Sequence, residues 1–208
     1  MESEFDGVLA IIPARKGSKR LPGKNKANFA GKPLWLNTAH IARDAGIKKI
    51  VVTTDDEEIL STAGHDLIML KRSKETAGDD AATEDVILEV IHQLTQQGIE
   101  DKEYKTICLL QCTSPLLTPR TLRHALHQFQ EKSMRCLIAY NRDYKPCGAF
   151  YIFRYAEFLF YGNSCYGIDD LHIYILSPEQ AIDVDNLWDW RAAQAVKSGR
   201  VVKHWQFY

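Results

Sequence analysis

A basic loop near the start of the chain carries residue types that could bind a phosphate. Five cations and two glycines follow the apolar residues 7–12, and the cations are Arg15, Lys16, Lys19, Arg20 and Lys24. Like charges this close repel one another, so a bound anion would stabilise them. Glycine turns and backbone N–H groups that follow a buried strand often bind a polyphosphate. The loop therefore predicts an anion site whose charge comes from Arg15, Lys19 and Lys24.

Two familiar phosphate-loop patterns do not fit this stretch. A Walker A loop has four residues between its glycines and Ser or Thr after its lysine. Here five residues separate Gly17 from Gly23, and Asn25 follows Lys24. The dinucleotide pattern G-x-G-x-x-G is also absent. Composition alone leaves open a solvated surface or a nucleic-acid patch, but the position of the cations directly after an apolar run favours a nucleotide site.

Two aspartates far along the chain could bind a divalent cation. Asp183 and Asp185 are two residues apart, so on an extended segment both carboxylates point to one face. Hard cations such as Mg²⁺ prefer oxygen ligands of this kind. The residues alone leave open the alternative of two exposed carboxylates near a helix start.

Composition describes an ordinary globular chain. Its 208 residues are 45% hydrophobic and 25% charged, which predicts a single domain over residues 1–208. The net charge of −1 predicts neither nucleic acid nor a membrane as partner. No signal peptide and no run of 18 apolar residues is present, so a cytoplasmic protein is expected. Five cysteines without a C-x-x-C pair are expected to be reduced and mostly buried.

Strands alternate with helices over most of the chain. Apolar runs predict strands at residues 7–12, 49–54, 67–70, 106–111 and 136–140. Helical spacing and end signals predict helices at residues 33–45, after 55–58, at 83–97 and at 119–132. The alternation predicts an α/β fold with a mostly parallel open sheet and helices on both faces. The loops after Ala14, Leu70 and Gln111 should then converge on one crevice at the carboxyl ends of the strands.

The pattern of predicted strands and helices changes in the last part of the chain. Aromatic-rich stretches predict strands at residues 149–153 and 172–176, and a closing helix is predicted at 186–198. Three tryptophans near that helix, Trp188, Trp190 and Trp205, are candidate anchors.

The basic loop, "RKGSKRLPGKN", resembles a specific family signature. The cytidylyltransferases that activate sialic acid and related nine-carbon 2-keto sugar acids as CMP-sugars share R-x-G-S-K-x-x-P-x-K-N, and every fixed position is matched. The CMP-Kdo synthetases have a related opening that matches less well. Four further segments are similar to family motifs, at residues 72–85, 110–116, 148–152 and 182–190. Departures from those motifs are Ser73, Thr76, Cys112 and Cys147.

This resemblance to the CMP-sialic acid synthetase family spans nearly the whole chain, and it implies a fold and a reaction. The fold is the three-layer, Rossmann-like nucleotide-diphospho-sugar transferase type. The anomeric hydroxyl of the sugar acid attacks the α-phosphate of CTP, and pyrophosphate leaves. Mg²⁺ is the implied cofactor, and CTP and a sialic, legionaminic or pseudaminic type of acid are the implied small-molecule partners. The crowded cations would then be balanced by the triphosphate rather than by acidic side chains.

The resemblance also implies roles for particular residues. The expected nucleotide contacts are Arg15, Gly17, Ser18, Lys19, Lys24 and Asn25 in the loop, with Arg72, Ala81 and Thr83 at the cytosine. The expected sugar-acid contacts are Gln111, Thr113 and Ser114, although a capped turn before Pro115 also explains them. The expected metal ligands are Asp183 and Asp185, which with Arg15 and Lys24 form the expected catalytic set.

One family feature is missing. Only residues 141–147 separate the strand that ends at Tyr140 from the next strand, where family members insert a dimerisation arm that reaches into the partner's site. A weakened homodimer is therefore expected, with a smaller acceptor pocket completed by residues 161–170. Two alternatives stay open: a CMP-Kdo-like or other nucleotidyltransferase, and a CTP- or CMP-binding protein without transfer activity.

Overall fold

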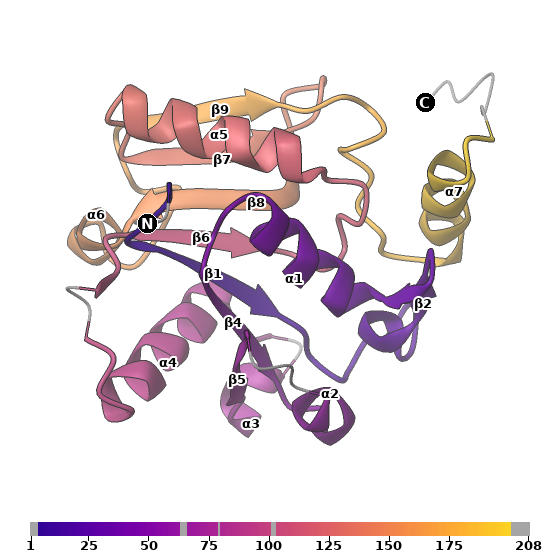
Figure 1. Cartoon of the computed structure of the whole chain (residues 1–208), viewed down its shortest axis with the longest axis horizontal. Helices are drawn as coiled ribbons and strands as arrows, with labels where there is room; N and C mark the ends of the chain where they lie inside the picture. The colour runs from indigo at the N-terminus through magenta and orange to yellow at the C-terminus, as the bar shows by residue number, and fades with distance from the viewer. Residues whose placement is uncertain (1–3, 63–65, 79, 101–102, 201–208) are drawn as a thin grey trace.

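A seven-stranded sheet forms the centre of the computed structural model, which describes residues 4–62, 66–78, 80–100 and 103–200 (Figure 1). The strand order is β5-β4-β1-β6-β8-β7-β9. The strands are β1 (Val8–Pro13), β4 (Lys49–Thr54), β5 (Ile68–Lys71), β6 (Thr106–Leu110), β7 (Cys136–Tyr140), β8 (Pro146–Arg154) and β9 (Leu171–Ile175). Only β8 runs antiparallel to its neighbours, β6 and β7. The prediction of a mostly parallel sheet is confirmed.

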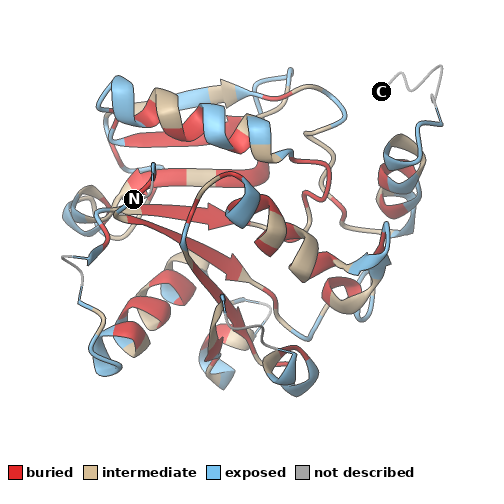
Figure 2. Ribbon diagram, in the orientation of Figure 1, coloured by how far each residue is buried: buried red, intermediate tan, exposed pale blue. Residues whose placement is uncertain are grey.

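Helices cover both faces of this sheet, as predicted. Alternate residues of β1 belong to two separate cores: Val8, Ala10 and Ile12 pack with α1 (Leu34–Asp44) and α5 (Pro119–Glu131). Leu9 and Ile11 pack on the other side with α4 (Thr83–Gln96) and α6 (Tyr155–Phe160). A strand covered on both faces has no polar side, which explains the continuous apolar run. In Figure 2 the central strands are buried, and the helices present exposed residues only on their outer sides.

The short elements were not predicted. They are the 3-10 helix η1 (Lys24–Lys26), the hairpin of β2 (Asn28–Phe29) and β3 (Lys32–Pro33), and α3 (Lys74–Ala77). Asp56 caps α2 (Glu57–Ser61) by accepting from the N–H of Glu58, as the acidic run indicated. The closing helix α7 (Leu187–Lys197) starts with a capping box, and Trp205 lies outside the described residues.

The segment between β7 and β8 is a tight turn. Asn141 N–H donates to the carbonyl of Lys145 at 2.9 Å, and the Asn141 side chain accepts from the N–H groups of Asp143 and Lys145. The expected shortening of the arm therefore corresponds to a closed hairpin over residues 141–145. All five cysteines are free and buried, as predicted. None of the helices in the described ranges has both the length and the apolar character of a membrane span.

Candidate functional site

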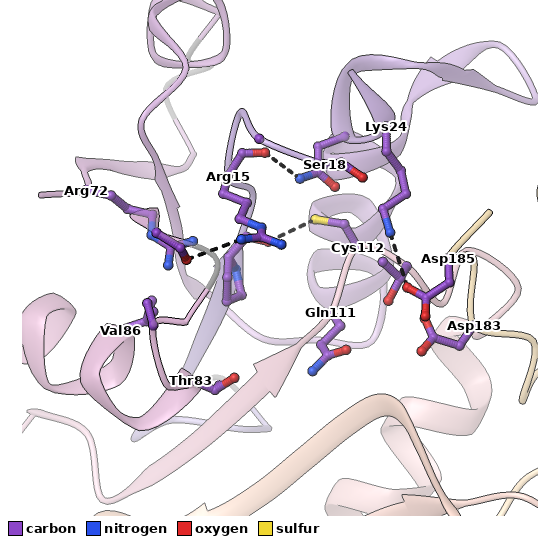
Figure 3. Close-up of a pocket in the computed structure, with 16 residues that line it drawn as sticks. Arg15, Ser18, Lys24, Arg72, Thr83, Val86, Gln111, Cys112, Asp183 and Asp185 are labelled. Atoms are coloured by element: carbon purple, nitrogen blue, oxygen red, sulfur yellow. Dashed lines mark hydrogen bonds and ion pairs between the residues drawn. The ribbon is translucent and has the colours of Figure 1, made fainter. Parts of the chain in front are cut away.

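A cavity of about 300 Å³ lies where the carboxyl ends of β1, β5 and β6 meet the segment before α7 (Figure 3). The predicted convergence of the loops after Ala14, Leu70 and Gln111 is confirmed, because Arg15, Arg72 and Gln111 all line it. The other predicted residues that line it are Gly17, Ser18, Lys24, Asn25, Ala81, Thr83, Thr113, Asp183 and Asp185. Residues that line it without having been predicted are Pro13, Gly78, Val86 and Cys112.

Two predicted residues do not line this cavity. Lys19 is exposed on the basic loop. Ser114 is buried within the turn that follows β6, and its hydroxyl has no hydrogen-bond partner in the described part of the chain. The N–H of Ser114 donates to the carbonyl of Gln111 at 3.3 Å, and its own carbonyl accepts from Leu117. The serine side chain is therefore buried in a turn and does not line the cavity, as the structural explanation of the motif allowed.

The basic loop is held in place by contacts to distant segments. The Arg15 guanidinium donates to the carbonyl of Gly78 at 3.2 Å, and the Asn25 side chain donates to the carbonyl of Arg15 at 2.8 Å. Gly23 has a left-handed backbone, with φ of 69°, where the chain turns into η1. Asn25 therefore fixes the loop as well as lining the cavity.

Lys24 connects the loop to the acidic segment. Its side chain is buried, and its Nζ donates to the carbonyl of Val184 at 2.7 Å and lies 3.7 Å from Asp185 Oδ1. Figure 3 shows Lys24 pointing toward the two aspartates, which lie beside it. The cations at the tip of β1 and the carboxylates before α7 thus share one site, although about 160 residues separate them in the chain.

Acidic side chains balance part of the loop's charge, which corrects the expectation that the triphosphate alone would do so. Arg20 Nη1 lies 2.5 Å from Asp185 Oδ2. Lys26 Nζ lies 3.1 Å from Asp56 and 2.5 Å from Glu58. These acids come from α2 and the segment before α7, so only the fold brings them to the loop.

Asp183 is the aspartate with a carboxylate oxygen that lacks a hydrogen-bond partner among the described residues. Val184 is fully buried in the core, and its N–H donates to the carbonyl of Thr113 at 2.7 Å. Both flanking aspartates line the cavity, as the two-residue spacing predicted. Asp183 Oδ1 is buried without a hydrogen-bond partner among the described residues. Burial raises the pKa of Asp183 and the neighbouring charge of Asp185 adds to the rise, whereas the Thr113 hydroxyl and Lys24 oppose it.

A hard divalent cation fits this donor set. A buried carboxylate oxygen without a partner, beside a second carboxylate, is what such an ion would satisfy. In the described ranges no three His, Cys, Asp or Glu side chains cluster as a metal site. The remaining ligands would therefore come from water and phosphate oxygens, an arrangement typical of Mg²⁺ sites.

Gly148 in β8 is a site residue that sequence reasoning quoted only as part of a motif. Its φ is +74°, and a Cβ there would lie 2.7 Å from Gln111 Oε1 and 3.8 Å from Asp183 Oδ2. Glycine is needed for the backbone conformation and also to leave room for Gln111. The sequence signal for this position is a glycine inside a strand of otherwise bulky residues, which indicates a close approach by another group.

Arg72 is a buried charge on the opposite wall. It is 7% exposed, its guanidinium donates to the carbonyl of Thr76, and its Nε has no partner in the described part of the chain. Burial lowers the pKa of Arg72, while Asp55 and Glu89 oppose that effect. Ser73 caps α3 through the N–H of Thr76, so two departures from the family motif build the short helix that holds Arg72.

A second cavity of about 180 Å³ adjoins the first, because Thr83 and Gln111 line both. Its other walls are Glu84, Ile87, Leu109, Tyr151, Cys165 and Tyr166. The hydroxyls of Tyr151 and Tyr166 are 3.4 Å apart. Cys165 and Tyr166 belong to the segment 161–170 that was expected to complete an acceptor pocket.

The fold and this site agree with the comparison to known families. The Cytidylyltransferase family model matches residues 9–155, so the chain belongs to the cytidylyltransferase family.

Among its relatives are enzymes named for nonulosonic acids. The chain is 43% identical over 133 residues to CMP-N,N'-diacetyllegionaminic acid synthase of Legionella pneumophila, covering 61% of this chain and 56% of the relative. It is 34% identical over 169 residues to pseudaminic acid cytidylyltransferase of Campylobacter jejuni, covering 79% and 68%. It is 33% identical over 136 residues to 3-deoxy-manno-octulosonate cytidylyltransferase of Rhizobium etli, covering 64% and 50%. The chain thus spans only about half to two thirds of these relatives' length.

Solved structures share the fold. CMP:2-keto-3-deoxy-manno-octonic acid synthetase complexed with CTP has a TM-score of 0.65 at 18% identity, covering 93% of this chain and 99% of that chain. Rv0371c of Mycobacterium tuberculosis H37Rv in complex with manganese has a TM-score of 0.62 at 16% identity, covering 90% and 97%. Likeness at these identities shows the nucleotidyltransferase type of fold alone.

Proposed function

We propose that this chain transfers CMP from CTP to a nine-carbon 2-keto sugar acid and releases pyrophosphate. The observation that carries the proposal is one cavity lined both by the cations Arg15 and Lys24 and by the carboxylates Asp183 and Asp185. Cations and a carboxylate pair in one cavity match a nucleoside triphosphate bound with a divalent cation. Membership of the cytidylyltransferase family supports the choice of CTP.

In this proposal the basic loop and the segment after β5 bind the nucleotide. Arg15, Ser18 and Lys24 neutralise and orient the triphosphate, and phosphoryl chemistry depends mainly on such positioning. Arg72, Ala81 and Thr83 line the same cavity and contact the cytosine base. The unpartnered Nε of Arg72 is a donor available to a carbonyl of the base.

The reaction forms and breaks one bond to phosphorus. The anomeric oxygen of the acid bonds to the α-phosphorus of CTP, the bond from that phosphorus to the bridging oxygen of the β-phosphate breaks with its electrons going to pyrophosphate, and the hydroxyl proton passes to solvent water. Asp183 and Asp185 would hold Mg²⁺, which when bound supplies charge neutralisation at the phosphates. Lys24 keeps those carboxylates in place through the carbonyl of Val184.

The second cavity is the proposed acceptor site. Gln111 and Thr83 stand between the two cavities, so a molecule in the second cavity adjoins the nucleotide. The tyrosine hydroxyls offer hydrogen bonds to neutral polar groups of the sugar. Tyr166 comes from the chain itself, and we propose that it replaces the contacts of the missing arm.

Legionaminic or pseudaminic acid is the proposed acceptor type, because the relatives named for these acids are 43% and 34% identical. A Kdo-type acid is the second candidate, since a relative named for it is 33% identical. The test is pyrophosphate release from CTP and Mg²⁺ with legionaminic, pseudaminic, sialic and Kdo acids, and then with ATP, GTP and UTP. Release with CTP and a nonulosonic acid supports the proposal. Tight CTP binding without release for every acid would indicate a binding protein instead.

A further inference from the structure

Arg20 makes a contact that no pattern in the loop explains. Its guanidinium Nη1 lies 2.5 Å from Asp185 Oδ2. Arg20 occupies a position that the family signature leaves open, and it does not line the cavity itself. Asp185 does line the cavity, and its second oxygen lies 3.7 Å from Lys24. One of the two candidate metal ligands is therefore already occupied by a cation.

The contact is not needed to hold the loop. Lys24 reaches the carbonyl of Val184, and Asn25 reaches the carbonyl of Arg15, so the loop has two tethers of its own. The backbone of Asp185 is also fixed independently, because its N–H donates to Asp189 at 2.9 Å. The side chains of Arg20 and Asp185 are 69% and 48% exposed. Ion pairs this exposed are weak and readily exchanged.

The two aspartates thus differ in burial and in pairing, although they belong to the same motif. Asp183 Oδ1 is buried and without a partner in the described part of the chain, whereas Asp185 is paired with Arg20. A cation shared by both carboxylates must compete with the guanidinium for Asp185. A guanidinium released at this point would face a bound triphosphate, and arginine binds phosphate through two parallel hydrogen bonds.

We propose that Arg20 is a positioning residue that holds Asp185 in the empty protein and moves to the triphosphate when nucleotide and divalent cation bind. This inference rests on the proposed function, because it takes CTP and a divalent cation as the ligands. Arg20 then has opposite effects on the two ligands. It competes with the cation for Asp185, and it contributes a phosphate contact to the nucleotide.

The test measures both affinities by titration calorimetry, with MnCl₂ alone and with CTP in saturating Mn²⁺. Arg20→Ala is expected to bind Mn²⁺ about two to five times more tightly, the range for removal of an exposed competing pair. The same variant is expected to bind CTP about ten to a hundred times more weakly, through loss of a charged hydrogen bond. Arg20→Lys should restore most of the Mn²⁺ effect but less of the CTP effect, since lysine lacks the planar fork.

Lys16→Ala is the matched control, because it removes one positive charge from the same exposed loop without touching Asp185. Equal shifts in Arg20→Ala and Lys16→Ala would overturn the inference and leave only a long-range charge effect. If Arg20→Ala bound both Mn²⁺ and CTP more tightly, or both more weakly, the inference would also be overturned. If the wild-type protein bound neither CTP nor Mn²⁺, the proposed function would fall together with this inference. Normal wild-type binding with no Arg20 effect overturns this inference alone.

Discussion

Replacement of Asp183 by asparagine should inactivate the protein and stabilise it. The substitution keeps the shape of the side chain but removes a carboxylate whose Oδ1 is buried and unpartnered in the described residues. Loss of this charge removes a ligand for the divalent cation, and we expect turnover to fall by about 100-fold or more, as for other single electrostatic groups at reacting phosphates.

The gain in stability follows from burial. A buried polar group without a partner costs about 1–3 kcal/mol. Asp183 is partly exposed to the cavity and Lys24 offsets some of the cost, so the lower end, about 1 kcal/mol, is expected. For a chain of this size that corresponds to a rise in Tm of about 2–4 °C at pH 7.

The gain should depend on pH in a defined direction. Burial raises the pKa of Asp183 above its ordinary value of 3.8, so the folded protein holds this proton more tightly than the unfolded chain does. The wild-type protein therefore loses stability as the pH rises above 3.8 and through the folded pKa. The advantage of Asp183→Asn should shrink as the pH falls toward 3.8.

Thermal unfolding with EDTA, from pH 7 down to pH 4.5, measures this effect. Asp185→Asn is the matched control, because Asp185 is paired with Arg20 and half-exposed, so its removal should give no gain. Turnover near the wild-type rate in Asp183→Asn would refute the metal assignment. A lower Tm than wild type at pH 7 would refute the claim that the charge of Asp183 is incompletely compensated.

Three further changes test other parts of the site. Gly148→Ala should cost about 1–2 kcal/mol in urea unfolding through its left-handed backbone, and it should lower turnover about tenfold because the new Cβ displaces the Gln111 side chain. Gly162→Ala, with φ of +70° and no described atom within 4 Å, should cost a similar amount of stability without lowering turnover, and equal turnover in the two variants would contradict the displacement of Gln111. Arg72→Lys should weaken CTP binding about tenfold by calorimetry, and unchanged affinity would remove Arg72 from the base site. Tyr166→Ala should raise the acceptor KM about tenfold and leave the KM for CTP unchanged, whereas an equal rise in both would argue against a separate acceptor cavity.

Most of the fold could be predicted because its strong elements have simple patterns. β1 and β6 are buried on both faces, so they read as unbroken apolar runs, and α4 and α5 each carry one apolar stripe. The 3-10 helix, α3 and the β2–β3 hairpin have two to four residues per element, too few for any period to appear. β8 begins at Pro146, three residues before its predicted start, because the apolar pattern does not extend into the hairpin turn.

The candidate site could be predicted only where its residues are close in the sequence or match a family motif. The basic loop is one continuous stretch, so its charge was visible directly. The partners of that charge were not visible, because Arg20 and Asp185 are 165 residues apart and Arg15 and Gly78 are 63 apart. Ser114 carried the right chemistry, but the turn after β6 buries its side chain.

Asp183 and Asp185 differ in burial and in pairing, and this difference affects how the site would bind a cation. Asp183 is held by a backbone anchored in the core through Val184, and its buried charge is a standing attraction for a cation. Asp185 is more exposed and already paired, so it adds little attraction until Arg20 leaves. A cation alone therefore meets one strong ligand and one competitor, whereas a cation with a triphosphate gives Arg20 an alternative anion. This arrangement favours joint binding of metal and nucleotide over binding of the metal alone.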